Sequence, residues 1–285
     1  MTEFELVAYD DPARFLAAAE RFLRTAEAEN SMLYLPAERI VLAPQDDDAG
    51  CYWATVSARG AIIAAAFHHP IGGVLVTAGP DRACALIAAD MAERARTPNS
   101  VVGPLASCEA FARTWRERTG QAHMLRFHLR HFELTQPPPV FTARGCARLP
   151  LDSETETLVD WTVAFVAEVA LPETEEQTRR RAKNRIGNGQ VRIWDDGGPV
   201  AFAGYGADAS DTVRIAPVYT PPEFRGKGYA SALVADLSRE LFARGKRAIF
   251  LTTDVANPTS NSIYQRIGYR PVADHYHFSL FPTTA

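Results

Sequence analysis

The chain has 285 residues, 47% of them hydrophobic, which is long for one α/β domain and sufficient for two cores. Its formal net charge of −4 provides no basic field, so neither nucleic acid nor a membrane is expected as a partner. Residues 1–12 hold four carboxylates and no apolar run, which predicts neither a signal peptide nor a membrane span, and hence a cytoplasmic location.

No metal site is predicted. The four cysteines are scattered without a CxxC pair, and we expect four small buried thiols: Cys51, Cys84, Cys108 and Cys146. His68 and His69 are adjacent, so on a strand they would point to opposite faces. A third ligand is missing near the pair His275 and His277.

In the amino-terminal half, the pattern predicts a hairpin, a strand and a helix. Residues 52–57 and 62–67 flank Arg59 and Gly60 as hairpin strands, 73–77 read as a strand, and 81–96 as a helix. The three prolines 137–139 disfavour both helix and central strand. We therefore predict a first domain over 1–136, a linker over 137–145 and a second domain over 146–285.

The carboxyl-terminal half continues the alternation of strands and helices, which indicates an α/β class. A turn cluster at 195–198 separates two runs of β-prone residues, which predicts a hairpin. The expected strands are 146–149, 190–194, 200–205, 213–219 and 249–251, and the expected helices are 154–169, 173–184 and 231–245.

Between the strand at 213–219 and the helix at 231–245 lies the run Arg225, Gly226, Lys227, Gly228, Tyr229, Ala230. Small residues at 226, 228 and 230 let a phosphate approach the backbone, and the first N–H groups of the helix would point at it. The run is neither a Walker loop nor GxGxxG, because a lysine separates its two glycines and a tyrosine follows the second. The sequence therefore predicts a phosphate seat built mainly from backbone, with Arg225 and Lys227 adding charge.

The RxxGxA pattern of this run and the downstream block from Asn257 to Tyr269 stand in order and at the expected spacing. Together they resemble the GNAT superfamily of acyl-CoA-dependent N-acyltransferases, over about 161–276. The resemblance implies a mixed, largely antiparallel sheet flanked by helices, with the pyrophosphate of acetyl-CoA at the loop. The amino-terminal half has the same order of elements, which makes it similar to a degenerate GNAT-like domain in a tandem arrangement. Its equivalent turn, 78–82, holds a proline and a carboxylate where phosphate would bind. An unrelated α/β domain is the alternative for this half.

The resemblance also implies roles for single residues. The strand before the loop would be splayed from its neighbour, and Pro217 fits an edge or a bulge there. Val218 and Thr220 would then offer backbone groups to the pantetheine arm. By the same match, Asn257 would bond the pantetheine or the helix start, and Asn261 could do either.

Tyr264 is the candidate general acid. Spacing alone favours a core tyrosine packed with Ile263 and Ile267, whereas the family match places a tyrosine near the CoA sulfur. Candidates for the base are Asp254 after the strand at 248–253, and Glu168 and Glu173 at the helix pair that lines the acceptor pocket in the family. A water relay is the further alternative for the base.

The sequence therefore predicts an acyltransferase that moves acetyl, not an aminoacyl group, from acetyl-CoA to a small-molecule or peptide amine, as a monomer or homodimer. No covalent intermediate is expected, because no cysteine or serine stands in the motif as a nucleophile. Two alternatives remain: a non-catalytic acyl-CoA-binding regulator on the same fold, and an aminoacyl transferase that uses charged tRNA. The latter is expected to be basic and to lack the loop.

Overall fold

The computed structural model describes residues 3–45, 48–171, 173–207 and 209–283. Contacts divide the chain into two compact units. Unit 1 comprises 1–131, 253–257 and 272–285, and unit 2 comprises 132–252 and 258–271. Most of the carboxyl-terminal strand belongs to unit 1, and its residues 276–279 pair with residues 100–103.

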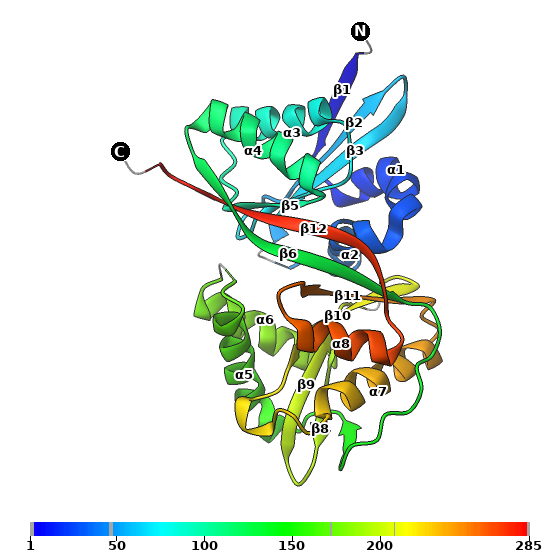
Figure 1. Ribbon diagram of the computed structural model, residues 1–285. Coiled ribbons are helices and arrows are strands. Elements are labelled where there is room, and N and C mark those ends of the chain that lie inside the picture. The colour runs from blue at the N-terminus through cyan, green and yellow to red at the C-terminus, as the bar shows by residue number, and fades with distance from the viewer. Residues whose placement is uncertain (1–2, 46–47, 172, 208, 284–285) are drawn as a thin grey trace. The chain divides into compact units, whose positions relative to one another are not determined.

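The two halves of the chain repeat one order of elements (Figure 1). In the first half the strands are β1 (Phe4–Tyr9), β2 (Tyr52–Ala58), β3 (Ala61–His68), β4 (Val74–Val76), β5 (Ser100–Gly103) and β6 (Ala122–Leu134). Its helices are α1 (Pro12–Leu23), α2 (Glu27–Leu42), α3 (Asp81–Glu93) and α4 (Leu105–Thr119), with the 3-10 turn η1 (Arg24–Ala26).

In the second half the strands are β7 (Cys146–Arg148), β8 (Val191–Asp195), β9 (Pro199–Tyr205), β10 (Thr212–Tyr219), β11 (Ala248–Asp254) and β12 (Arg270–Phe281). Its helices are α5 (Thr155–Glu168), α6 (Glu175–Gly187), α7 (Tyr229–Ala243) and α8 (Pro258–Ile267), with the 3-10 turns η3 (Asp152–Glu154) and η4 (Pro222–Phe224). Among the described residues, no helix combines the length and the hydrophobicity that crossing a membrane requires.

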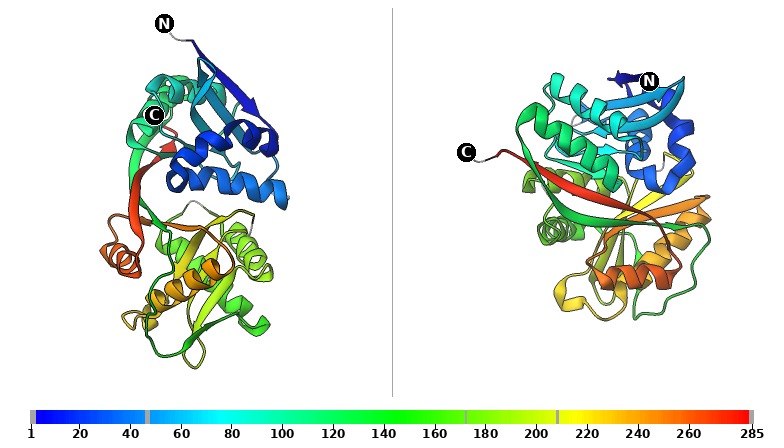
Figure 2. Two further views of the ribbon diagram at one scale, coloured as in Figure 1. Left: turned by 90° about the vertical axis from the view of Figure 1, so that its right-hand side faces the viewer. Right: turned by 45° about the horizontal axis from the view of Figure 1, so that its top comes forward.

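The sheet of unit 1 has the strand order β1-β2-β3-β4-β5-β12-β6. β4 pairs with β5 in parallel, whereas the pairs β1–β2, β2–β3, β3–β4 and β5–β12 are antiparallel. Successive side chains of β2 enter different cores, as the period of a strand requires. Ala54 and Val56 pack with α3 and α4, which lie next to each other (Figure 2). Trp53 packs on the opposite face with Phe15 of α1 and Tyr34 of α2. The sheet is therefore a central layer between two helix pairs.

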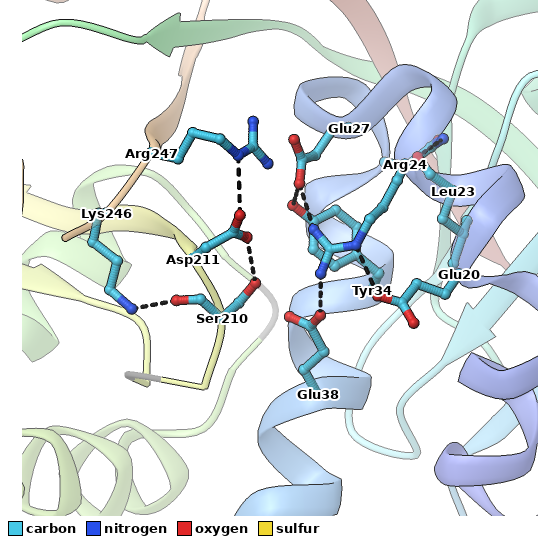
Figure 3. Close-up of polar contacts among 11 residues, drawn as sticks. Glu20, Leu23, Arg24, Glu27, Tyr34, Glu38, Ser210, Asp211, Lys246 and Arg247 are labelled. Carbon is cyan, nitrogen blue, oxygen red and sulfur yellow. Dashed lines mark hydrogen bonds and ion pairs between the residues drawn. The ribbon is translucent and has the colours of Figure 1, made fainter.

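Ion pairs and hydrogen bonds join neighbouring elements within each unit (Figure 3). In unit 1, Arg24 pairs with Glu20 at 2.9 Å, with Glu27 at 2.5 Å and with Glu38 at 2.7 Å, which fixes the corner between α1 and α2. In unit 2, Arg247 pairs with Asp211 at 3.0 Å, and the preceding lysine donates to the carbonyl of Ser210. These contacts join the start of β10 to the start of β11.

The sheet of unit 2 has the strand order β11-β10-β9-β8-β7. Ala201 and Ala203 of β9 face α7, whereas Phe202 between them faces Leu158 of α5. The same alternation places Gly204 on the face covered by α5 and α6. Cys146 is exposed, which corrects the expectation of four buried thiols, because β7 is a three-residue edge strand paired only with β8.

Candidate functional site

The run from Arg225 to Ala230 forms a tight turn that opens α7. Gly226 has φ 79°, and Gly228, the N-cap of α7, has φ 82°, both in the left-handed region that favours glycine. A Cβ atom built at either glycine would meet nothing within 4 Å. These glycines are therefore required for backbone conformation, and the space in front of them is open to a ligand.

The start of α7 lacks a side-chain cap among the described residues. Ala232 donates its backbone N–H to the Gly228 carbonyl at 3.1 Å, so the regular helix bonds begin there. The N–H groups before that position point out of the helix, and the helix dipole adds partial positive charge. This end of α7 can therefore accept an anion.

The two cations of the loop differ in their contacts. Arg225 donates to the Thr220 carbonyl at 2.9 Å and to Glu168 at 2.7 Å, so its guanidinium ties the loop to the end of β10 and to α5. The hydrogen bond to Glu168 raises the pKa of Arg225. Lys227 is exposed, and its ammonium lies 5.6 Å from the centre of the Phe224 ring. Lys227 is thus better placed than Arg225 to reach a phosphate from solvent.

Tyr229 has a structural role that the sequence did not indicate. Its side chain is only 6% exposed, and its hydroxyl donates to Asp196 at 2.5 Å, which raises the pKa of the phenol. Asp196 also pairs with Arg144 at 2.9 Å. Tyr229 therefore anchors the start of α7 on the β8–β9 turn, and only its backbone faces the seat. Ala230 follows it half-buried.

β10 separates from one neighbour just before the loop. It pairs with β11 in parallel only over 212–214, opposite 248–250. Its pairing with β9 is interrupted by a bulge between Ile215 and Val218, where Pro217 lies after a cis peptide bond. The bulge that Pro217 predicted is therefore present, and it reverses which residues face α7, because Val218 packs with Ile215 in one core while Tyr219 lies in the other.

Thr220 follows directly after β10. Its hydroxyl oxygen is buried and has no hydrogen-bond partner among the residues that the structure describes. Buried polar atoms usually have a partner, so this hydroxyl fits a site where a ligand supplies one. The Thr220 carbonyl, in contrast, already accepts from Arg225.

Tyr264 lies on α8 with its ring 6.2 Å from that of Phe132 and 6.0 Å from that of Tyr269. Its hydroxyl has no hydrogen bond to any described residue, and burial raises the pKa of the phenol to about 12. Asn261 is half-buried one turn earlier on the same side of the helix. The phenol therefore carries its proton at neutral pH, although it also packs against the core as the sequence spacing suggested.

Comparison with known proteins separates the two halves of the chain. Residues 155–269, which include the loop, the β10 bulge and Tyr264, match the model of the acetyltransferase (GNAT) family. This stretch is therefore similar to GNAT acetyltransferases. No curated protein matches the sequence significantly.

Solved structures similar to this chain share its fold along the whole length. They include a GCN5-related N-acetyltransferase from Sphaerobacter thermophilus, with 18% identity, a TM-score of 0.59 and coverage of 98% of this chain and 97% of that chain. A Drosophila protein has 14% identity, a TM-score of 0.65 and full coverage of both chains. A tandem GNAT protein from the clavulanic acid biosynthesis pathway has 14% identity, a TM-score of 0.57 and coverage of 99% and 100%.

All three carboxylates considered as the base have partners. Glu168 pairs with Arg225 at 2.7 Å, and Glu173 pairs with Arg181 at 3.0 Å. Asp254 accepts the backbone N–H of Ala256 at 2.9 Å and thereby shapes the turn between β11 and α8. None of the three side chains is thus left without a structural contact.

Asn257 is exposed, and its backbone N–H bonds the Asp254 carbonyl at 3.0 Å. Both residues are grouped by their contacts with unit 1, whereas Tyr264, Asn261 and the loop belong to unit 2.

The corresponding turn in the first half, 78–82, is not suited to bind a phosphate. Helix α3 begins after Pro80, and Asp81 in its first turn pairs with Arg113 at 3.3 Å. A Cβ at Gly79 would lie 2.8 Å from the Ala64 Cβ and 2.9 Å from the Ile63 carbonyl oxygen. Gly79 is therefore needed for close packing on β3, whereas Gly226 and Gly228 of the second half face open space.

One group of possible metal ligands lies in unit 1. The donor atoms of Asp48, Cys51 and His69 lie within 4.8 Å of one another. Asp48, however, forms a two-pronged ion pair with Arg39, and the Nδ1 atom of His69 accepts from the N–H of Ile71 at 3.3 Å. Asp48 is thus already neutralised by Arg39, so these three residues do not by themselves argue for a metal, and the absence of a metal stays a prediction.

Proposed function

We propose that the chain is an N-acetyltransferase that transfers acetyl from acetyl-CoA directly to a primary amine. The observation that carries the proposal is the uncapped start of α7. Two left-handed glycines face open space there, next to the strand that separates from β11. Such a helix end binds phosphate through backbone N–H groups. Its position inside a GNAT domain supports the pyrophosphate of acetyl-CoA as that phosphate.

Each residue of the seat has a proposed task. The backbone from Gly226 to Ala230 and the ammonium of Lys227 bind the pyrophosphate. Backbone groups of Val218 and the free hydroxyl of Thr220 bond the pantetheine arm, which explains the missing partner of that hydroxyl. Asn257 and Asn261 bond the pantetheine or hold the start of α8.

In the proposed reaction, the amine nitrogen attacks the thioester carbon, the C–N bond forms and the C–S bond breaks. The sulfur leaves as a thiolate, and Tyr264 donates a proton to it. With a phenol pKa of about 12 against about 8.5 for a free thiol, complete transfer is uphill by roughly 5 kcal/mol. Tyr264 is therefore effective as a hydrogen-bond donor to the developing thiolate, with full transfer following as product leaves.

The base is proposed to be a water that relays the ammonium proton to solvent. Of the candidate carboxylates, Glu168 is ion-paired and Asp254 holds a turn, so each would lose a structural contact on accepting a proton. Both remain candidates that substitution can test. The acceptor pocket, the oligomeric state and the cytoplasmic location remain predictions from the sequence.

A CoA-release assay with acetyl-CoA and a panel of amines tests the proposal. The panel should include polyamines, amino acids, amino sugars, aminoglycosides and peptides. Release of CoA that depends on an amine, together with the acetylated product in a mass spectrum, would support it. Binding of acetyl-CoA without turnover of any amine would favour the regulator instead, and absence of binding would overturn both.

A further inference from the structure

Arg185 on α6 differs from the other cations of its helix. No hydrogen bond or ion pair joins its guanidinium to any residue that the structure describes. Three neighbouring cations pair with carboxylates: Arg179 with Asp160 and Glu175, Arg181 with Glu173, and Lys183 with Glu156. Arg185 thus has hydrogen-bond donors left over, and a guanidinium carries five.

The side chain of Arg185 is held beside the bulge of β10. A Cβ at Gly204 of β9 would lie 2.8 Å from the Arg185 Cδ, 3.0 Å from the Ala216 carbonyl oxygen and 3.1 Å from the Pro217 Cδ. Only a residue without a side chain leaves room for the stem of Arg185 at this position. The residue as a whole is half-buried, so a ligand can still reach it from solvent.

The electrostatic setting of Arg185 is unusual for this chain. Burial lowers its pKa to about 10, the charge of Arg181 adds to the effect, and the carboxylate of Glu173 offsets part of it without a hydrogen bond. At Arg148 and Arg225, carboxylate partners raise the pKa instead. Arg185 is therefore still charged at neutral pH, but it has lost part of its hydration without gaining a hydrogen-bonded partner among the described residues.

A purely structural role does not account for these observations. Packing over Gly204 needs only the aliphatic stem, which an uncharged side chain of similar length would supply. Keeping a charge that is partly removed from water and unpaired is costly unless something binds it. The bulge next to Arg185 lies just beyond the point where β10 leaves β11, on the strand proposed to receive the acetyl group.

We propose that Arg185 recognises an anionic oxygen group, a carboxylate or a phosphate, on the amine acceptor. The inference rests on the proposed acetyl transfer and names its substrate class: an amine that also carries a negative charge. The planar guanidinium can hold either group through two parallel hydrogen bonds. Arg185 acts as a specificity residue and takes no part in the chemical step.

Matched pairs of acceptors test this assignment. The kcat/KM for acetylation should be measured for glutamate and glutamine, aspartate and asparagine, amino acids and their amides, and glucosamine 6-phosphate and glucosamine. We expect the anionic member of at least one pair to be favoured tenfold or more, and the pairs distinguish carboxylate from phosphate. Arg185→Gln should lower kcat/KM for that member about 100-fold and change the neutral member less than threefold, whereas Arg185→Lys should retain part of the preference.

Lys183→Gln is the matched control. It removes the same charge from the same helix, but Lys183 is 52% exposed and pairs with Glu156, so the preference should persist. Equal activity toward both members of every pair, or equal loss of both in Arg185→Gln, would overturn the inference while leaving acetyl transfer intact. A tenfold loss of acetyl-CoA affinity in Arg185→Gln would instead assign this arginine to the cofactor. Absence of acetyl-CoA binding in the unmodified protein, measured by calorimetry, would overturn the proposed function itself.

Discussion

Tyr264 combines a packed aromatic ring with a hydroxyl that is available for the proposed chemistry. Its ring lies among core aromatics, while its hydroxyl is left without a partner in the described chain. The neighbouring Tyr269 lies in the same aromatic cluster, but its hydroxyl forms a hydrogen bond with the Ser238 hydroxyl at 2.9 Å. The two tyrosines therefore form a natural comparison between a free and a satisfied phenol.

We expect Tyr264→Phe to lower kcat by about ten- to a thousandfold, at the lower end of general-acid effects because the phenol acts mainly as a hydrogen-bond donor, with acetyl-CoA affinity nearly unchanged. Steady-state kinetics and calorimetry measure the two quantities. Tyr269→Phe, which removes a hydroxyl from the same cluster, should leave kcat within about twofold. Unchanged turnover in Tyr264→Phe, with chemistry rate-limiting, would make Tyr264 a core residue only.

The backbone of the loop, and not its charges, should supply most of the cofactor affinity. Gly228 has φ 82°, which a β-branched residue adopts only with strain. We expect Gly228→Val to weaken acetyl-CoA binding at least tenfold, and Lys227→Ala to weaken it only a few-fold, because that ammonium is exposed and screened. Calorimetry on both variants decides the matter, and a reversed order would show that side-chain charge holds the cofactor.

At the scale of elements, Arg148 joins three of them. From β7 it pairs with Glu154 of η3 at 2.6 Å and with Asp195 at the end of β8 at 2.5 Å. The hydrogen bond from Arg148 lowers the pKa of Glu154. The pKa of Asp195 is also lowered, first by the backbone N–H of Gly198 and then by Arg148.

We expect Arg148→Gln to lower the free energy of unfolding by about 1–2 kcal/mol at pH 7. Lowered folded-state pKa values mean that these carboxylates stabilise the fold fully above their unfolded values near ~4, and lose that effect as pH falls through the folded values. The difference between variant and parent should therefore shrink below about pH 4. Urea unfolding at pH 7 and pH 3 measures this difference in the free energy of unfolding. As a control, Lys183→Gln, which breaks the exposed ion pair with Glu156, should lower the free energy of unfolding by less than about 0.5 kcal/mol. A difference that grows on acidification would contradict this account.

Features that depend on a few adjacent residues could be predicted from the sequence, whereas side-chain contacts between distant residues could not. The glycines of the loop, the β8–β9 turn and the proline of the bulge act through their own backbone, so their effects could be derived from a few adjacent residues. The bond from Tyr229 to Asp196 joins residues 33 positions apart, and nothing in either neighbourhood indicates it. Arg185 could likewise not be distinguished from the other arginines of its helix, because only the fold shows which of them form an ion pair with a carboxylate.

At the scale of the molecule, the repeated order of elements raises the question of how many cofactors one chain binds. The second half offers an open backbone seat, whereas the first offers a packed glycine, a proline without an N–H and the carboxylate of Asp81. Like charges at ~4 Å cost about 1 kcal/mol in water and several near a protein surface.

We therefore expect one acetyl-CoA per chain in a calorimetric titration of the intact protein. Gly228→Val should weaken that site at least tenfold. A stoichiometry of two, or a second site that survives in the variant, would show that the first half also binds the cofactor.

The place of β12 has a consequence for how the protein is made. Unit 1 contains residues 1–131 but completes its sheet with β12, whose residues 276–279 pair with β5. During synthesis the first 131 residues leave the ribosome first, and domains generally fold in that order. We therefore expect the β5 edge of the amino-terminal half to stay unpaired until β12 has been translated.

Residues 1–136 produced alone should therefore aggregate or stay partly unfolded, because β5 has an unpaired edge. Supplying residues 137–285 in the same cell should recover soluble protein, which copurification through a tag on one fragment would detect. A monomeric, cooperatively folding 1–136 fragment would contradict this. If the prediction holds, translation of the whole chain, and not of each half, is the event that commits this protein to its fold.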